Sequence, residues 1–215
     1  MRRFFVTALL LGSSLALADP AFAQRTPQPI APFAIDLRGF SVGLGQDLQT
    51  AADLAVDPTD LPSRALGGVG GVNVYLLRRG KFALGIGGEL LIARGRKTQV
   101  DARDVPTGLV VEQRLFSVAP AVSLNFGSRN GWSYLSAGMG PMRFETFKGE
   151  LPPVEAAPSQ ITLNFGGGAR WFATNHLAFC FDVRFYKTGA EEATPLYPGR
   201  NANRLIVLSA GVSIK

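Results

Sequence analysis

The 215 residues include one cysteine and one histidine, the residue types on which disulfides and zinc sites depend. Cys180 has no second cysteine to pair with, and zinc sites need several Cys or His ligands. We therefore expect no internal disulfide and no metal site, and we interpret Cys180 as a packing residue. The chain also lacks basic runs interleaved with aromatics, so its modest net charge of +6 does not predict nucleic-acid binding.

Long apolar runs are scarce, and the clearest one lies at the N-terminus. Residues 4–17 are mostly apolar, which is shorter than the roughly 20 residues that a membrane-spanning helix needs. Two arginines precede this segment and an Ala-x-Ala triplet at residues 21–23 follows it, as in a secretory signal. We expect a signal peptide over residues 1–23, cleaved near Ala23. A short anchor helix is the alternative.

Phosphate-binding and calcium-binding motifs are also missing. The glycine clusters at residues 67–71 and 166–168 are not followed by Gly-Lys-Ser/Thr, which completes a phosphate-binding loop. The aspartates of residues 46–65 have a spacing that matches no calcium loop, so we interpret this segment as a flexible surface loop. The sequence therefore predicts no cofactor.

What the chain has instead is alternation with a period of two, most clearly over residues 160–187. Ile161, Leu163 and Phe165 share one face with polar or small residues between them, and residues 177–187 repeat the pattern. Successive side chains of a strand point to opposite sides, so the pattern predicts two strands with one apolar face each. Residues 174–176 then form the turn between them, and no helical period of 3.6 is present.

The same alternation predicts eight antiparallel strands in one closed all-β barrel that spans an outer membrane. Short turns and long loops alternate between the strands, as in bacterial outer-membrane barrels. The proline-rich residues 24–34 form a periplasmic leader, and residues 35–215 form the barrel. The predicted strands are residues 35–45, 66–77, 82–94, 110–127, 132–147, 160–173, 177–187 and 203–214, and the predicted long loops are residues 46–65, 95–109, 148–159 and 188–202.

The direction of the two faces decides between a membrane barrel and a soluble carrier, whose apolar face would surround a ligand. The polar face consists mainly of Gly, Ala and Ser, which suits a narrow lumen better than a water-facing surface. We therefore place the apolar face outside, including Phe40, Val42 and Leu44 of the first strand. Aromatic residues beside the short turns are expected to form a girdle at the membrane interface. These are Phe82, Phe126, Trp132 and Trp171.

Two features of the predicted strands need separate comment. Pro120 lies within the fourth strand and cannot donate to the ladder, so we expect a bulge or a local break there. Glu89, Arg170, Asp182 and Arg184 fall on the inner faces. Because an ion in a confined lumen is costly unless it is paired, we predict that these four neutralise one another across the barrel.

In strand count, face pattern and loop rhythm, residues 35–215 resemble the small eight-stranded outer-membrane barrels that include the OmpA transmembrane domain, OmpX and Ail. The resemblance implies an internal charge network that plugs the lumen or gates a small conductance. The chain differs from this family at its end, because such barrels usually end in an aromatic residue and this one ends in Ser213-Ile214-Lys215.

An enzyme of lipid A chemistry in such a barrel would need a histidine beside a serine or an acid. His176 lies in a predicted periplasmic turn with no serine near it in sequence, so we interpret it as a solvated turn residue and predict no catalytic residue.

We expect a monomeric, non-enzymatic outer-membrane barrel with a filled lumen and a structural or surface-interaction role. Its expected partners are outer-membrane lipid, including lipopolysaccharide near the rim arginines, and surface molecules that contact the four long loops. Two alternatives remain, namely a narrow channel for ions or small solutes and a soluble periplasmic lipid or ligand carrier.

Overall fold

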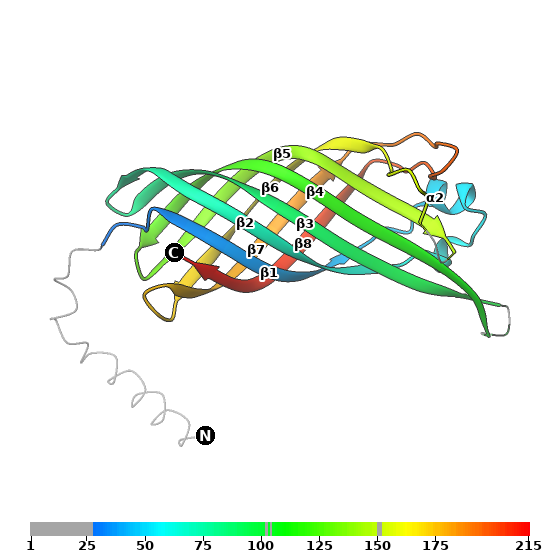
Figure 1. Ribbon diagram of the computed structural model, residues 1–215, viewed down its shortest axis with the longest axis horizontal. Helices are drawn as coiled ribbons and strands as arrows, with labels where there is room; N and C mark the ends of the chain where they lie inside the picture. Colours follow the sequence, from blue (N-terminus) through cyan, green and yellow to red (C-terminus); the bar gives the residue numbers. More distant parts are fainter. Residues whose placement is uncertain (1–27, 102, 104, 150–151) are drawn as a thin grey trace, which may run out of the picture.

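The computed structural model describes residues 28–101, 103, 105–149 and 152–215. The predicted signal peptide and residues 24–27 of the predicted leader lie outside this part. The described chain forms a closed antiparallel barrel of eight strands in sequence order (Figure 1). The strands are β1 (Phe33–Gly43), β2 (Arg64–Arg79), β3 (Phe82–Val100), β4 (Pro106–Ser128), β5 (Gly131–Lys148), β6 (Ser159–Phe172), β7 (Leu177–Thr188) and β8 (Asn203–Ile214).

Closure of the barrel confirms the predicted fold class. Each strand pairs with its sequence neighbours, and β1 also pairs with β8 from Ile35 opposite Ile214 to Val42 opposite Val207. The pairing therefore leaves no free edge among the described strands, which removes the unpaired backbone groups that an open sheet exposes. In the described chain, no helix has both the length and the hydropathy to cross a membrane.

The two ends of the barrel differ. The short turns lie at one end together with the C-terminus and the start of β1, and we call this the turn end (Figure 1). Gly80 of the first turn has φ +58°, a left-handed conformation that glycine adopts without steric cost. The other end, the loop end, carries the long connections, including helix α2 (Leu48–Asp53) and the 3₁₀ helix η2 (Pro58–Asp60).

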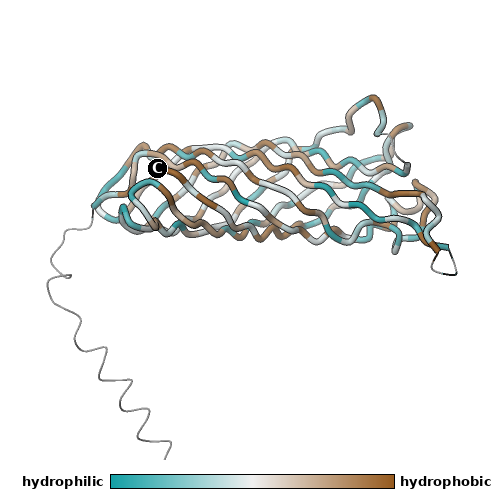
Figure 2. Tube along the Cα trace, turned by 60° about the horizontal axis from the view of Figure 1, so that its bottom comes forward, coloured by the Kyte–Doolittle hydropathy of each residue, from teal (hydrophilic) through white to brown (hydrophobic). Residues whose placement is uncertain are grey.

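Apolar residues recur along the strands, as the brown segments of the tube show (Figure 2), and many of the large ones are exposed on the outer wall. Leu84, Ile86 and Phe179 are 49%, 50% and 65% exposed, although side chains of this kind are normally buried. A continuous apolar surface of this extent is not stable in water and indicates a lipid environment. We call these outward apolar residues between Phe116 and Phe126 of β4, and at the same height on the other strands, the apolar band.

The faces of β2 to β8 follow the predicted alternation, but the prediction for β1 is wrong. Phe40, Val42 and Leu44 are 7%, 1% and 6% exposed and point into the barrel. The lipid-facing residues of β1 are Ile35 and Leu37, 46% and 68% exposed. The prediction failed because these three apolar side chains fill the lumen. Hydrophobicity alone therefore does not show which face of β1 points outward.

The long segments at the loop end also differ from prediction. Residues 95–109 are mainly strand, since β3 has 19 residues and β4 has 23. These polar continuations extend the sheet beyond the apolar band. Residues 46–65, predicted as a loop without regular structure, contain α2 and η2, whose N-caps are Asp47 and Asp57. The ends of the other six strands lie within two residues of their predicted positions, and the largest differences, of two residues, are in β1 and β2.

Pro120 causes a break without a bulge. On one side it pairs in register with Gly88 of β3. On the other side the ladder to β5 stops at Ser117 opposite Met142 and resumes at Ala121 opposite Gly138, with the same register. The missing N–H of a proline, and the presence of Pro141 on the facing segment of β5, account for this interruption.

A charge on the apolar band should destabilise the barrel. We expect Ile86→Arg, near the middle of the band on β3, to lower the free energy of unfolding in lipid vesicles by about 2–4 kcal/mol. Leu48→Arg on α2 is the control, because Leu48 is 69% exposed at the loop end and should tolerate the charge. Urea titration measures both, and equal small effects would indicate that Ile86 faces water.

Candidate functional site

Six charged side chains meet inside the barrel, and we call them the lumen network. Three are acidic and three are basic, so their formal charges cancel. They come from β1, β3, β6 and β7 and are largely withdrawn from solvent. The network consists of Asp36, Arg38, Glu89, Arg170, Asp182 and Arg184.

Two arginines bridge the same pair of acids. Arg38 donates to Glu89 and lies 3.1 Å from Asp182 between Nη1 and Oδ1. Arg184 lies 2.9 Å from Glu89 between Nη1 and Oε2, and 3.2 Å from Asp182 between Nη2 and Oδ2. Each acid therefore contacts two guanidinium groups, which offsets the cost of removing these charges from water.

Arg170 and Asp36 form the second part of the network. The Nε of Arg170 donates to Asp36 Oδ1 at 2.9 Å. Tyr134 joins the two parts, because its hydroxyl donates to Asp182 at 2.8 Å and its ring centroid lies 4.2 Å from the Arg170 guanidinium carbon. Gly168 makes room for this tyrosine, since an added Cβ would lie 2.7 Å from its hydroxyl.

The four network residues predicted from the sequence all lie inside the barrel. Arg184 pairs with Glu89 and Asp182, whereas Arg170 pairs with Asp36. Asp36 and Arg38 were not predicted as network residues, because the two faces of β1 were assigned the wrong way round. The alternation of Ile35 and Leu37 with these two charges was the available signal. Without Asp36, the predicted set would leave Arg170 with no acid of its own.

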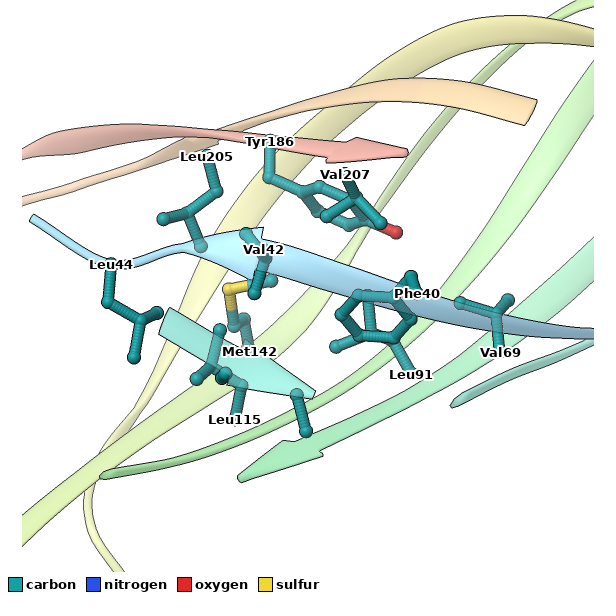
Figure 3. Packing of buried hydrophobic residues seen from close by; sticks show 12 residues of the cluster. Phe40, Val42, Leu44, Val69, Leu91, Leu115, Met142, Tyr186, Leu205 and Val207 are labelled. Atoms are coloured by element: carbon teal, nitrogen blue, oxygen red, sulfur yellow. The ribbon is translucent and has the colours of Figure 1, made fainter. Parts of the chain in front are cut away.

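An apolar plug closes the lumen between the network and the loop end. Phe40 and Leu91 follow Arg38 and Glu89 by two residues on their strands. They pack in one cluster with Leu115, Met142 and Leu205 (Figure 3). All five are at most 7% exposed. This loop-end plug also contains Val42, Leu44, Ala65, Val69, Ala93, Tyr186 and Val207.

A second apolar plug lies between the network and the turn end. Ile30 and Ala31 of the predicted leader pack with Tyr75 and Trp132, and the ring centroids of the last two are 5.9 Å apart. The assignment of Trp132 to the outer girdle is therefore wrong, because it is 2% exposed. A residue beside a short turn can face either the membrane or the lumen. Trp132 lies on the same face of β5 as Tyr134, and this face points into the lumen.

The other predicted girdle residues lie on the outer wall at the turn end. Phe82 is 58% exposed and Trp171 is 59% exposed. Phe126 is partly buried against Phe82, with ring centroids 5.7 Å apart in an edge-to-face arrangement. Contact of these three with a membrane interface stays a prediction.

The turn end and the described loops contain few residues that could act in catalysis or metal binding. His176 is exposed in the turn before β7, with Nδ1 3.3 Å from the Lys215 carbonyl oxygen. Within the residues that the structure describes, no group of three His, Cys, Asp or Glu side chains could hold a metal ion. Cys180 is buried and unpaired with any other cysteine.

No family model and no curated relative matches the sequence. Among solved structures, neisserial surface protein A has a TM-score of 0.49 and 13% identity, covering 86% of this chain and 97% of its own. OprG of Pseudomonas aeruginosa has a TM-score of 0.48 and 10% identity, covering 88% and 97%. Ail of Yersinia pestis in a nanodisc has a TM-score of 0.42 and 14% identity, covering 84% and 97%. The chain is similar to small outer-membrane barrels. At these identities the similarity concerns only the fold.

Breaking the lumen network should destabilise the barrel strongly. We expect Arg170→Glu to prevent folding or to cost about 3–5 kcal/mol, because it leaves Asp36 unpaired beside a second carboxylate. Arg79→Glu, at an exposed position of the turn end, is the matched control and should fold normally. The heat-modifiable gel shift and the urea midpoint report both, and an unchanged midpoint for Arg170→Glu would contradict a structural network.

Proposed function

We propose that the protein is a monomeric, non-enzymatic outer-membrane barrel with a closed lumen that acts through its outer surface. The observation that carries this proposal is the filling of the lumen in three layers, namely loop-end plug, lumen network and turn-end plug. Eight strands enclose a space just wide enough for side chains, so these three layers fill the lumen and leave no room for a wide pore.

The size of the apolar band supports the membrane location. Phe116 and Phe126 bound the outward apolar residues of β4. Ten residue steps correspond to about 34 Å along a strand and to about 25 Å of height at a tilt of about 45°. This matches the apolar band of outer-membrane barrels, in which the short turns face the periplasm and the long loops face outward.

The first and the last of the outward loops are held together as one cap. Asp47 accepts hydrogen bonds from the backbone and side-chain nitrogens of Asn201, at 3.0 and 2.7 Å. Thr50 and Asp53 of α2 both contact Gly199, at 2.9 and 2.7 Å. Residues far apart in the sequence therefore fix the first loop against the last one, and the cap can present a preformed surface.

Apolar side chains on this cap are suited to contact a partner. Leu48 is 69% exposed and Leu196 is 47% exposed. They lie in the first and the last of the long loops and outside the apolar band, so lipid does not cover them. Exposed apolar residues beside polar ones are typical of interaction surfaces.

Single-channel recording in planar bilayers tests the closed lumen. We expect no reproducible conductance step, and we expect none from Trp132→Ala, because the lumen network and the loop-end plug remain in that variant. A step of fixed size in the wild-type protein would contradict the closed lumen and favour the narrow channel.

Loss of Asp47 should loosen the cap. Asp47→Ala removes the cap of α2 and both contacts with Asn201, and helix caps contribute about 1 kcal/mol. We expect faster proteolysis within residues 46–65 of protein in lipid vesicles. Asp57→Ala is the matched control, since among the described residues the Asp57 side chain is hydrogen-bonded to Thr59 of its own segment alone. Equal cleavage rates for the two variants would contradict the docked cap.

The same contact should depend on pH. Partial burial raises the pKa of Asp47, but hydrogen bonds from Asn201, Thr50 and Gln49 outweigh this effect and lower the pKa below its ordinary value of 3.8. A lowered pKa means that the contact stabilises the cap above the ordinary value and loses its effect as the pH falls through the folded-state value. Proteolysis with an acid-active protease should therefore accelerate only below about pH 3.8 in the wild-type protein.

A further inference from the structure

A cluster of arginines lies on the outer wall at the loop-end edge of the apolar band. Arg94 of β3 is directly opposite Arg114 of β4, and both continue the lipid-facing rows that end at Ile92 and Phe116. Arg143 of β5 pairs in register with Phe116 and is also exposed. Like charges directly opposite each other destabilise a sheet, so this arrangement needs an anion.

Glu112 supplies one of the negative charges that these arginines need. Its side chain is 2% exposed and accepts from the Nε atoms of Arg94, Arg96 and Arg114 at 2.6, 2.5 and 2.6 Å. The three arginine side chains remain 47%, 56% and 36% exposed. One carboxylate thus orients three guanidinium groups on the outer wall, and two positive charges stay uncompensated within this set.

An apolar groove lies directly beside these arginines, on the side of the apolar band. It has a volume of about 490 Å³, and its wall is formed mainly by apolar atoms. Gly68 and Gly70 are the residues between Leu66 and Val72 on the lipid-facing side of β2, and without side chains they leave open space beside the groove. Arg94, Arg114 and Arg143 line the same groove, together with Leu66, Ile92, Ala93, Leu115, Phe116 and Glu145.

We propose that this groove binds a phosphorylated glycolipid of the outer leaflet, namely the lipid A part of lipopolysaccharide. Its phosphates would contact Arg94, Arg114 and Arg143, because guanidinium groups bind phosphate with paired hydrogen bonds. One acyl chain would lie in the groove. With Arg143 and with Glu145, which is directly opposite Arg114, the whole cluster has four arginines and two carboxylates and keeps a net charge of +2. This charge favours a lipid with two phosphates over a phospholipid with one. The site does not depend on a closed lumen or on the loop cap.

The barrel contains a second basic pair that distinguishes a site from general attraction. Lys187 of β7 is directly opposite Arg204 of β8, and both are exposed near the loop end. Neither lines the groove. A specific lipid site predicts that this pair is dispensable, whereas a diffuse basic belt predicts that both pairs matter equally.

The test uses the full chain in phosphatidylcholine nanodiscs that contain a small fraction of lipid A, with retained lipid counted by native mass spectrometry. We expect one retained lipid A per barrel in the wild-type protein. Arg94→Gln/Arg114→Gln should weaken retention about tenfold or more, and Arg143→Gln, which leaves the Glu112 contacts intact, should also weaken it. Lys187→Gln/Arg204→Gln should retain lipid A as the wild type does.

A glycine pair tests the groove separately. Gly68→Leu should block the acyl chain, and its Cβ meets only the Arg38 carbonyl oxygen at 3.6 Å, so the barrel should fold. Gly70→Leu adds the same side chain two residues away on the same face, where an added Cβ has no neighbour within 4 Å, and should retain lipid A. The heat-modifiable gel shift verifies folding of every variant.

Three results would overturn the proposal. The first is unchanged retention in the arginine variants, and the second is an equal loss in Lys187→Gln/Arg204→Gln. The third is equal retention of phosphatidylglycerol and lipid A by the wild-type protein, which would identify the occupant as any anionic phospholipid.

Discussion

Backbone groups in lipid have no water to bond with, and this constraint determines the rest of the structure. The strands must pair with one another and close, as β1 does with β8. Closure sends every second side chain into a cylinder that only eight strands enclose, while the others face lipid. Charges on the strands can therefore lie in only two places, either inside with opposite charges or beyond the apolar band. The six residues of the lumen network take the first solution, and the arginines around Glu112 take the second.

The two charged clusters differ in how completely they are neutralised. In the lumen network three acids match three bases, and apolar plugs separate them from both ends. Around Glu112 one acid serves three arginines, and these arginines remain partly exposed. A balanced buried cluster is suited to structural support, whereas an unbalanced exposed one is suited to bind an anion. The same chemistry thus supports different roles according to its surroundings.

Much of this fold could be predicted from the sequence, because lipid on one side and a narrow lumen on the other impose alternation. Strands such as β6 and β7 show it clearly, and they indicated Arg170, Asp182 and Arg184. The prediction was wrong where lumen residues are themselves apolar, as with Phe40 and Trp132. It also missed the length of β3 and β4, since strands beyond the band are polar and resemble loops. The contact between Asp47 and Asn201 joins distant segments, so no local pattern could reveal it.

The most direct test of the account measures which side of β7 faces lipid. Single spin labels at successive positions from residue 179 to residue 183, in a Cys180→Ser background in lipid vesicles, report collisions with oxygen dissolved in the membrane. The account predicts high oxygen access at residues 179, 181 and 183 and low access at residues 180 and 182. The reverse phase, or access to a water-soluble relaxing agent at residues 179 and 181, would contradict a barrel with a lipid-facing apolar wall and charges enclosed in its lumen.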